Sequence, residues 1–249
     1  MDIAILLHDQ ITALDAVGPY EVLSRMPDTS VHFVATRPGL IRADEGLGLY
    51  ADRALDDLPH PDVVLVPGSS SPAVALTDEA VLSWVRTAHA GAAWTASVCS
   101  GSLVLAAAGV LANRRATTHW IAMEHLRALG AIPVPQRIVV DGTVVTAAGV
   151  SAGIDLALRL AALLHGDHVA QALQLAIEYD PEPPFEVSAY TAPQSLRRTA
   201  ASLIGGAASR LPGTDRAGGS AVAVADPPGR GSAEELPEGR GGGRCPVGL

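Results

Sequence analysis

The sequence contains no lysine. All 17 basic residues are arginine, and 26 acidic residues outnumber them, so the formal net charge is −9. Schiff-base chemistry of the pyridoxal-phosphate or lysine-aldolase kind needs a lysine amine and is excluded. A Walker phosphate-binding loop needs a Gly-Lys pair and is excluded as well. Because the chain is acidic and lacks a basic stripe, we expect no nucleic-acid partner.

Cysteines and long apolar runs are also scarce. Two cysteines, Cys99 and Cys245, cannot form a disulfide framework and are too few for the usual zinc spacings. We therefore expect no metal site and a reducing, cytoplasmic location. No apolar run reaches the roughly 18 residues of a membrane span, and the start "MDIAILLHD" has no basic leader. We expect neither a membrane partner nor a signal peptide.

The composition changes near residue 204. The segment 204–249 holds 12 of the 25 glycines and no aromatic residue. Such a segment buries too little apolar area to offset the entropy of ordering it. We therefore predict one domain over residues 1–203 and a disordered tail over 204–249, with a short helix at about 195–203 just before the tail.

The body alternates short β-prone runs with helical patterns, which favours a mostly parallel sheet covered by helices on both faces. Pro19 is expected only in the first turn of its helix, and Asp167 is expected to cap its own helix. The predicted fold is α/β, a flavodoxin-like three-layer sandwich. The predicted strands are 2–7, 30–36, 47–53, 62–68 and 93–98, with a hairpin at 137–149; the predicted helices are 14–26, 78–91, 101–109, 118–130, 152–166 and 167–180.

Cys99 lies where a strand-like run meets a helical one, in the stretch "AWTASVCSGSLVLAAAGVL". A strand-to-helix corner lifts its side chain above the sheet, as the nucleophile elbow of α/β-hydrolases does. Helix N-terminal N–H groups favour a thiolate, so we expect the pKa of the thiol to be lowered. The alternative is a buried cysteine that acts only as a small apolar side chain.

Asp15 is the best candidate for a proton partner of this thiol. It follows the loop after the first strand, among apolar neighbours, so a half-buried carboxyl group with a raised pKa is expected. A helix N-cap is the alternative role for this aspartate. His119, in "ATTHW", is a second possible base, although a single histidine near an apolar helix start is more often structural. The edge that carries Cys99 should also hold the Pro67-Gly68 turn, because parallel strands place their sites at their C-terminal ends.

Several stretches in the same order resemble the ThiJ/PfpI superfamily, whose fold is class I glutamine amidotransferase-like. Within it the chain resembles the isonitrile hydratase branch, which the last of these stretches favours. The match covers residues 2 to about 187. The stretches are "LDAVGPYEVL", "VLVPGS", "SVCSGSLVLAAAGVL", "RRATTHW", "DGTVVTAAGVSAGIDLALRL" and "QLAIEYDPEPPF".

The resemblance implies a catalytic Cys99 and an acidic partner Asp15, with Ser100 and Gly68 at the substrate or oxyanion site. Ser100 stands where the hydratases usually have Thr, so its hydrogen bond is expected to survive with looser positioning. Ser69 stands where the family often has a second glycine, so the backbone at Gly68 is expected to differ from the family's. The resemblance also implies a homodimer that uses no cofactor.

The implied activity is hydration of an isonitrile to an N-substituted formamide, a carbon–oxygen (hydro-)lyase reaction on a small molecule. The Cys99 thiolate would attack the terminal carbon, with Asp15 as general acid and then base. Two alternatives stay open. One is a ligand- or oxidation-sensing domain, like that of AraC-type regulators but without their DNA-binding domain. The other is an enzyme of the glyoxalase or deglycase type that acts on reactive aldehydes.

Overall fold

A seven-stranded sheet forms the middle of the structure, a computed structural model that describes residues 1–204. Residues 205–249 lie outside the described part, and with them almost all of the predicted tail. Every neighbouring pair in the sheet is parallel except β10 with β11. The order is β10 (Ile138–Asp141), β11 (Val144–Ala147), β7 (Trp94–Val98), β6 (Val63–Val66), β1 (Asp2–Leu6), β2 (Ser30–Ala35) and β5 (Arg53–Ala54).

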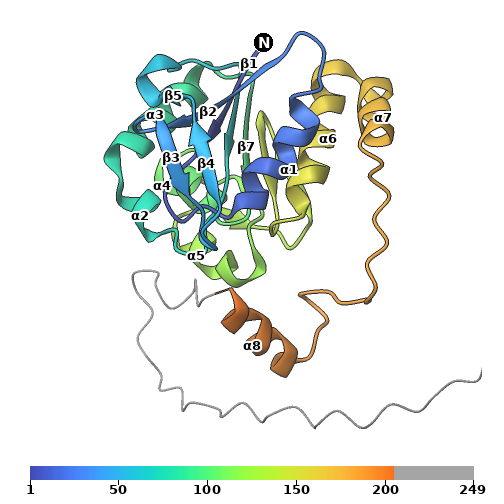
Figure 1. Ribbon diagram of the computed structural model, residues 1–249. Helices are drawn as coiled ribbons and strands as arrows, with labels where there is room; N and C mark the ends of the chain where they lie inside the picture. The colour runs from blue at the N-terminus through green and yellow to red at the C-terminus, as the bar shows by residue number, and fades with distance from the viewer. Residues whose placement is uncertain (205–249) are drawn as a thin grey trace, which may run out of the picture. The chain divides into compact units, whose positions relative to one another are not determined.

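Helices cover both faces of this sheet, which confirms the predicted three-layer α/β fold (Figure 1). One face carries α1 (Ala13–Leu23), α6 (Ala152–His165) and α7 (Asp167–Ala176). The other carries α2 (Ala73–Thr77), α3 (Glu79–Gly91), α4 (Gly101–Ala107) and α5 (Met123–Ala128). The predicted short helix before the tail is α8 (Gln194–Leu203), and two 3₁₀ turns are η1 (Leu55–Asp57) and η2 (Trp120–Ala122).

Side chains of one strand serve two cores, because successive residues of a strand point to opposite faces. In β1, Ile3 and Ile5 pack with α1 and α6, whereas Ala4 and Leu6 pack with α3 and α4. All four are fully buried. This explains why the strands read as continuous apolar runs, and it fixes the C-terminal end of each strand beneath the loops that build the site.

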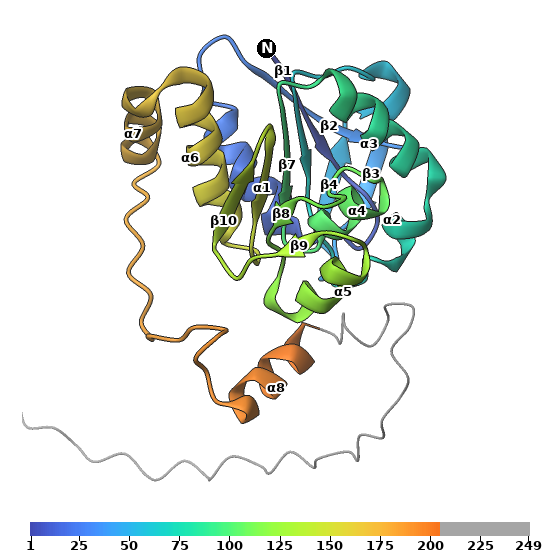
Figure 2. The same ribbon diagram turned by 180° about the vertical axis from the view of Figure 1, so that it is seen from behind.

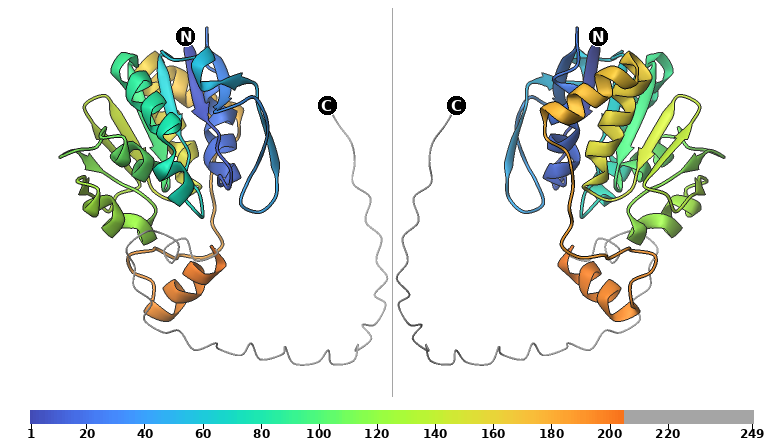
Figure 3. Two further views of the ribbon diagram at one scale, coloured as in Figure 1. Left: turned by 90° about the vertical axis from the view of Figure 1, so that its left-hand side faces the viewer. Right: turned by 90° about the vertical axis from the view of Figure 1, so that its right-hand side faces the viewer.

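The segment 47–53 departs from the predicted single edge strand. Its first part is β4 (Gly48–Ala51), which pairs with β3 (Gly39–Arg42) in a separate hairpin, and β5 follows at the edge of the main sheet. Figure 3 shows this hairpin standing away from the sheet. The predicted helix 118–130 is divided into η2 and α5, beside the short pair of β8 (Arg115–Ala116) and β9 (Ile132–Pro133) that Figure 2 shows.

Two expectations about helix ends were wrong. Pro19 lies in the second turn of α1 rather than the first, because α1 begins at Ala13. It is buried, and Gly153 of α6 leaves room for its ring: a Cβ on that glycine would lie 3.1 Å from Pro19 Cγ. Packing between α1 and α6 therefore compensates for the lost N–H. Asp167 is the first residue of α7, and the cap position is Gly166, with φ of 86°.

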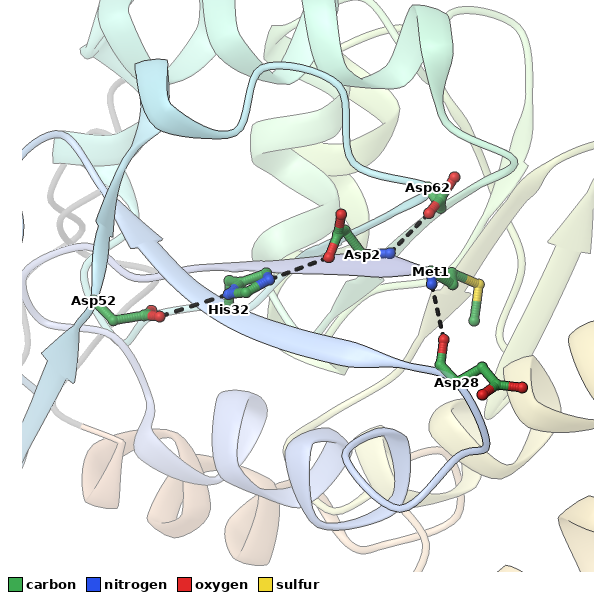
Figure 4. Close-up of polar contacts among 6 residues, drawn as sticks. All are labelled: Met1, Asp2, Asp28, His32, Asp52 and Asp62. Atoms are coloured by element: carbon green, nitrogen blue, oxygen red, sulfur yellow. Dashed lines mark hydrogen bonds and ion pairs between the residues drawn. The ribbon is translucent and has the colours of Figure 1, made fainter.

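Polar contacts stabilise the end of the sheet that lies opposite the C-terminal ends of its parallel strands (Figure 4). The Asp2 N–H donates to the Asp62 carboxylate at 2.7 Å, and the N-terminal amine donates to the carbonyl of Asp28 at 2.8 Å. The His32 ring lies between two carboxylates, 3.3 Å from Asp2 and 3.6 Å from Asp52. Among the described residues, no helix combines the length and the apolar character that a membrane crossing requires.

Candidate active site

Cys99 sits at the corner between β7 and α4, as predicted, and its backbone is in the left-handed region with φ of 56°. A non-glycine residue there is strained by about 1–3 kcal/mol and persists only when its surroundings hold it. The Cys99 N–H donates to the carbonyl of Ala148 at 2.8 Å. The Cys99 carbonyl accepts from the hydroxyls of Thr118, at 2.9 Å, and Ser102, at 3.2 Å. These contacts fix the direction of the thiol.

Two glycines let the loop after β6 approach this corner. A Cβ on Gly101 would lie 2.0 Å from the carbonyl oxygen of Val66, so only glycine fits there. A Cβ on Gly68 would lie 2.6 Å from the Ser100 nitrogen and 2.9 Å from the Asp15 carboxyl. The close approach brings the Gly68 backbone next to Asp15, the predicted acid, and next to Ser100, a predicted substrate-site residue.

Asp15 lies in the first turn of α1 and is fully buried, deeper than the half-buried position that we expected. Its Oδ2 accepts the Gly68 N–H at 2.9 Å, so it does not act as a helix cap. Its Oδ1 is buried and accepts no N–H or O–H hydrogen bond. Burial raises the pKa of Asp15 to about 7, which confirms the expected direction.

The prediction of a lowered pKa at Cys99 was wrong. The residue is 6% exposed, and burial raises the pKa of the thiol well above its usual value. Negative charge on the neighbouring Asp15 raises that pKa further. Backbone N–H groups of Ser100 and Val150 bond the sulfur and act in the opposite direction. These N–H groups thus favour the thiolate as expected, but the loss of hydration on burial raises the pKa of the thiol by more than they lower it.

The Ser100 hydroxyl joins the corner to the loop after β6. It accepts the Ser69 N–H at 2.8 Å and donates to the Ser69 carbonyl, also at 2.8 Å. Ser69 is itself buried, and its hydroxyl donates to the carbonyl of Gln10 at 2.7 Å. Because the N–H of Gly68 bonds Asp15, and that of Ser69 bonds Ser100, the oxyanion role predicted for Gly68 and Ser100 stays a prediction.

A cavity of about 200 Å³ opens above the thiol. His119, the second possible base, lines it, but burial lowers the pKa of this imidazole to about 4. Its Nδ1 accepts the Ile121 N–H at 3.4 Å, so the proton of the neutral ring is on Nε2. A base with so low a pKa is weak near pH 7. The lining residues are Thr12, Asp44, Glu45, Ser69, Ser70, Pro72, Cys99, Ser100, His119, Ile121, Ala122, Val150, Leu203 and Ile204.

Several lining residues were not singled out by sequence reasoning. Asp44 and Glu45 come from the tip of the β3–β4 hairpin, where the Thr12 hydroxyl donates to Asp44 at 2.8 Å. Four-residue strands give almost no alternation from which such a hairpin could be found. Leu203 and Ile204 approach from α8, far along the chain. Among residues 1–204, no group of three or more His, Cys, Asp or Glu side chains is placed to hold a metal ion.

The model of the DJ-1/PfpI family matches residues 1–163, which is well over half of the chain. The chain belongs to the DJ-1/PfpI family. An isonitrile hydratase of Pseudomonas putida is 44% identical over 197 residues, which cover 79% of this chain and 86% of that relative. This match agrees with the resemblance that the sequence motifs showed.

Two further relatives show which kinds of protein contain this fold. The crystal structure of a ThiJ/PfpI family protein from Pseudomonas syringae superposes with a TM-score of 0.80 at 33% identity, covering 84% of this chain and 88% of that one. The HTH-type transcriptional regulator CdhR of Pseudomonas aeruginosa is 33% identical over 161 residues, covering 63% of this chain but 48% of the regulator. The family fold therefore occurs in an enzyme and within a regulator, so activity has to be argued from the site.

Proposed function

We propose that the protein hydrates isonitriles to N-substituted formamides, with Cys99 as nucleophile and Asp15 as acid and base. The observation that carries this proposal is the arrangement of the pair. A strained corner directs a thiol to a cavity, and a buried carboxyl group with a pKa of about 7 lies beside that thiol. The 44% identity to an isonitrile hydratase supports the choice of substrate class.

One proton shared by the two groups is sufficient to start the reaction. When it lies on Asp15, Cys99 is a thiolate. The sulfur attacks the terminal carbon of R–N≡C and forms a C–S bond, and the Asp15 proton passes to the same carbon. The product of this step is a thioformimidate, R–N=CH–S–Cys99, beside an ionised Asp15. The Asp15 carboxyl group hydrogen-bonds the Cys99 side chain, and its Oδ1, which accepts no N–H or O–H group, is the oxygen that carries this proton.

Water completes the reaction. Its oxygen bonds to the imidate carbon, and its proton is relayed by Asp15 to the substrate nitrogen. Collapse of R–NH–CH(OH)–S–Cys99 breaks the C–S bond and gives R–NH–CHO. The hydroxyl proton returns to the Cys99–Asp15 pair, so one isonitrile and one water are consumed for each formamide. These steps need no metal or organic cofactor.

The direct test is to offer a simple isonitrile to the purified protein and to follow the formamide by NMR. We expect turnover by the natural chain and none by Cys99→Ala or Asp15→Asn. A turnover rate in Cys99→Ala equal to that of the natural chain would remove the covalent route. Methylglyoxal, assayed in parallel for lactate, tests the aldehyde-enzyme alternative.

A sensing role is the second candidate, and the 33% identity to a transcriptional regulator is the observation that favours it. Inertness toward isonitriles and methylglyoxal, together with saturable binding of a small molecule in the cavity, would support this role. We also propose a cytoplasmic homodimer, which is consistent with exposed apolar side chains of Leu40 and Tyr50 on the β3–β4 hairpin. Light scattering of the purified chain tests the dimer.

A further inference from the structure

One wall of the cavity is apolar and comes from two segments far apart in the sequence. Ile121 and Ala122 of η2 line it, together with Leu203 and Ile204 at the end of α8. Leu203 remains 78% exposed although it borders the cavity. An apolar group bound there would bury this side chain and gain free energy by doing so.

Helix α8, which supplies Leu203 to this wall, makes a cation–π contact with η2. Arg197 of α8 lies over the Trp120 ring, 5.1 Å from its centroid, and Trp120 directly precedes Ile121 in η2. No residue of α8 is buried, and a ten-residue helix is too short to be stable by itself. Its place beside α5, which Figure 2 shows, and beside Trp120 of η2 therefore depends on few contacts.

Other residues that line the cavity are polar. Thr12, Asp44 and Glu45 are among them, with the Thr12 hydroxyl donating to Asp44. These two carboxyl groups repel an anionic ligand. The apolar residues Ile121, Ala122, Leu203 and Ile204 offer no partner to a charge of either sign, so a substituent bound against them is uncharged and apolar, with the reactive end of the ligand at Cys99.

We propose that η2 and the end of α8 form the subsite for the substituent of the substrate, a neutral alkyl or cycloalkyl group, and that Arg197 over Trp120 holds this subsite together. Leu203 then determines specificity without taking part in the chemistry. That the reacting group of the ligand is an isonitrile depends on the proposed function. The existence of the apolar subsite does not depend on it.

The kinetic test compares methyl isonitrile, which leaves the subsite empty, with cyclohexyl isonitrile, which fills it. Leu203→Ala should raise KM for the cyclohexyl substrate about tenfold, because it removes an apolar side chain from the cavity wall. Arg197→Ala should raise it about two- to fivefold, because it removes the cation–π contact that holds α8 to η2. KM for the methyl substrate should change less than about twofold on the same scale, and kcat should stay near its original value for both. Arg198→Ala is the matched control, since Arg198 is an exposed arginine on the same helix.

A second readout does not depend on hydration. In a Cys245→Ser background, the rate of alkylation of Cys99 by N-benzyliodoacetamide is divided by its rate with iodoacetamide. The ratio cancels any change in thiolate content, because both reagents meet the same sulfur. We expect Leu203→Ala to lower this ratio about tenfold, Arg197→Ala to lower it about two- to fivefold, and Arg198→Ala to leave it unchanged.

The outcomes separate the two proposals. An unchanged ratio in Arg197→Ala and Leu203→Ala would overturn the subsite, even if the protein hydrates isonitriles. A lowered ratio in a protein that hydrates no isonitrile would support the subsite and refute the proposed function. An equal effect of Arg197→Ala and Arg198→Ala would overturn the role of the contact with Trp120.

Discussion

Replacing Asp15 with Asn should make the folded protein more stable near neutral pH while abolishing activity. The reason is that the carboxyl group is fully buried and its pKa is raised from 3.8 to about 7. Such a group binds its proton more tightly in the folded than in the unfolded state. Its contribution to stability is complete below pH ~4 and is lost as pH rises through about 7.

The magnitude follows from these two pKa values. A difference of one pH unit is worth ~1.4 kcal/mol, so ionisation of Asp15 costs the folded state ~4 kcal/mol between pH 4 and pH 8. Asn carries no charge and keeps an oxygen for the Gly68 N–H, but its amide adds buried donors, which costs about 1–3 kcal/mol. The net gain at pH 8 is therefore ~1–3 kcal/mol, or about 3–10 °C in Tm.

Urea unfolding at intervals between pH 4 and pH 8 measures both proteins. The decisive quantity is the slope: the stability of Asp15→Asn relative to the natural chain should rise by ~4 kcal/mol over this range. Asp28→Asn is the control, because Asp28 is exposed and its φ of 50° also suits Asn. A stability difference for Asp15→Asn that does not vary with pH would refute the account of a buried, protonated carboxyl group.

Three further predictions concern the same site. First, kcat/KM should rise with pH through about 7, since Asp15 and Cys99 are both protonated below it and no thiolate forms; a maximum near pH 5 would contradict this. Second, Ser100→Ala leaves the N–H and carbonyl of Ser69 unpaired, so chemical denaturation should show a loss of about 2–3 kcal/mol. Third, Gly101→Ala should cost about 3 kcal/mol or more, because its Cβ meets the Val66 carbonyl, whereas the control Gly91→Ala meets only the His60 side chain at 3.6 Å. Equal unfolding temperatures for the two glycine variants would contradict the third prediction.

The features that could be predicted from the sequence are those that depend on local pattern. The run Val63–Val66 is apolar at every position because both of its faces are covered, and Gly101 after Cys99 marks the tight corner. The adjacency of Asp15 and Gly68 followed from the rule that parallel strands bring their C-terminal ends to one edge. The hairpin at 137–149 was correct because its Asp-Gly turn is a strong local signal.

The features that could not be predicted depend on contacts between distant segments. The cavity wall joins Ile121 to Leu203, and no local pattern relates these two residues. In the hairpin that brings Asp44 to the cavity, the run that contains β4 was predicted as an edge strand, whereas β3 and its pairing with β4 were not predicted. The pKa of Cys99 was misjudged for the same reason: the N–H of Ser100 is a neighbour in sequence, whereas the burial that outweighs it comes from the assembled fold.

The raised pKa of Cys99 changes what the corner contributes to catalysis. A thiolate and an ionised Asp15 in one buried site repel each other, so the sulfur loses its proton readily only if the carboxyl group gains one. His119 does not compete for this proton, because its pKa is about 4. The corner places the sulfur beside a carboxyl group with a pKa of about 7, and in the proposed mechanism one proton moves between the two groups without leaving the site. In the proposed reaction, a substrate that bonds to the sulfur draws this proton onto its own carbon and leaves the negative charge on Asp15, which then accepts a proton from water.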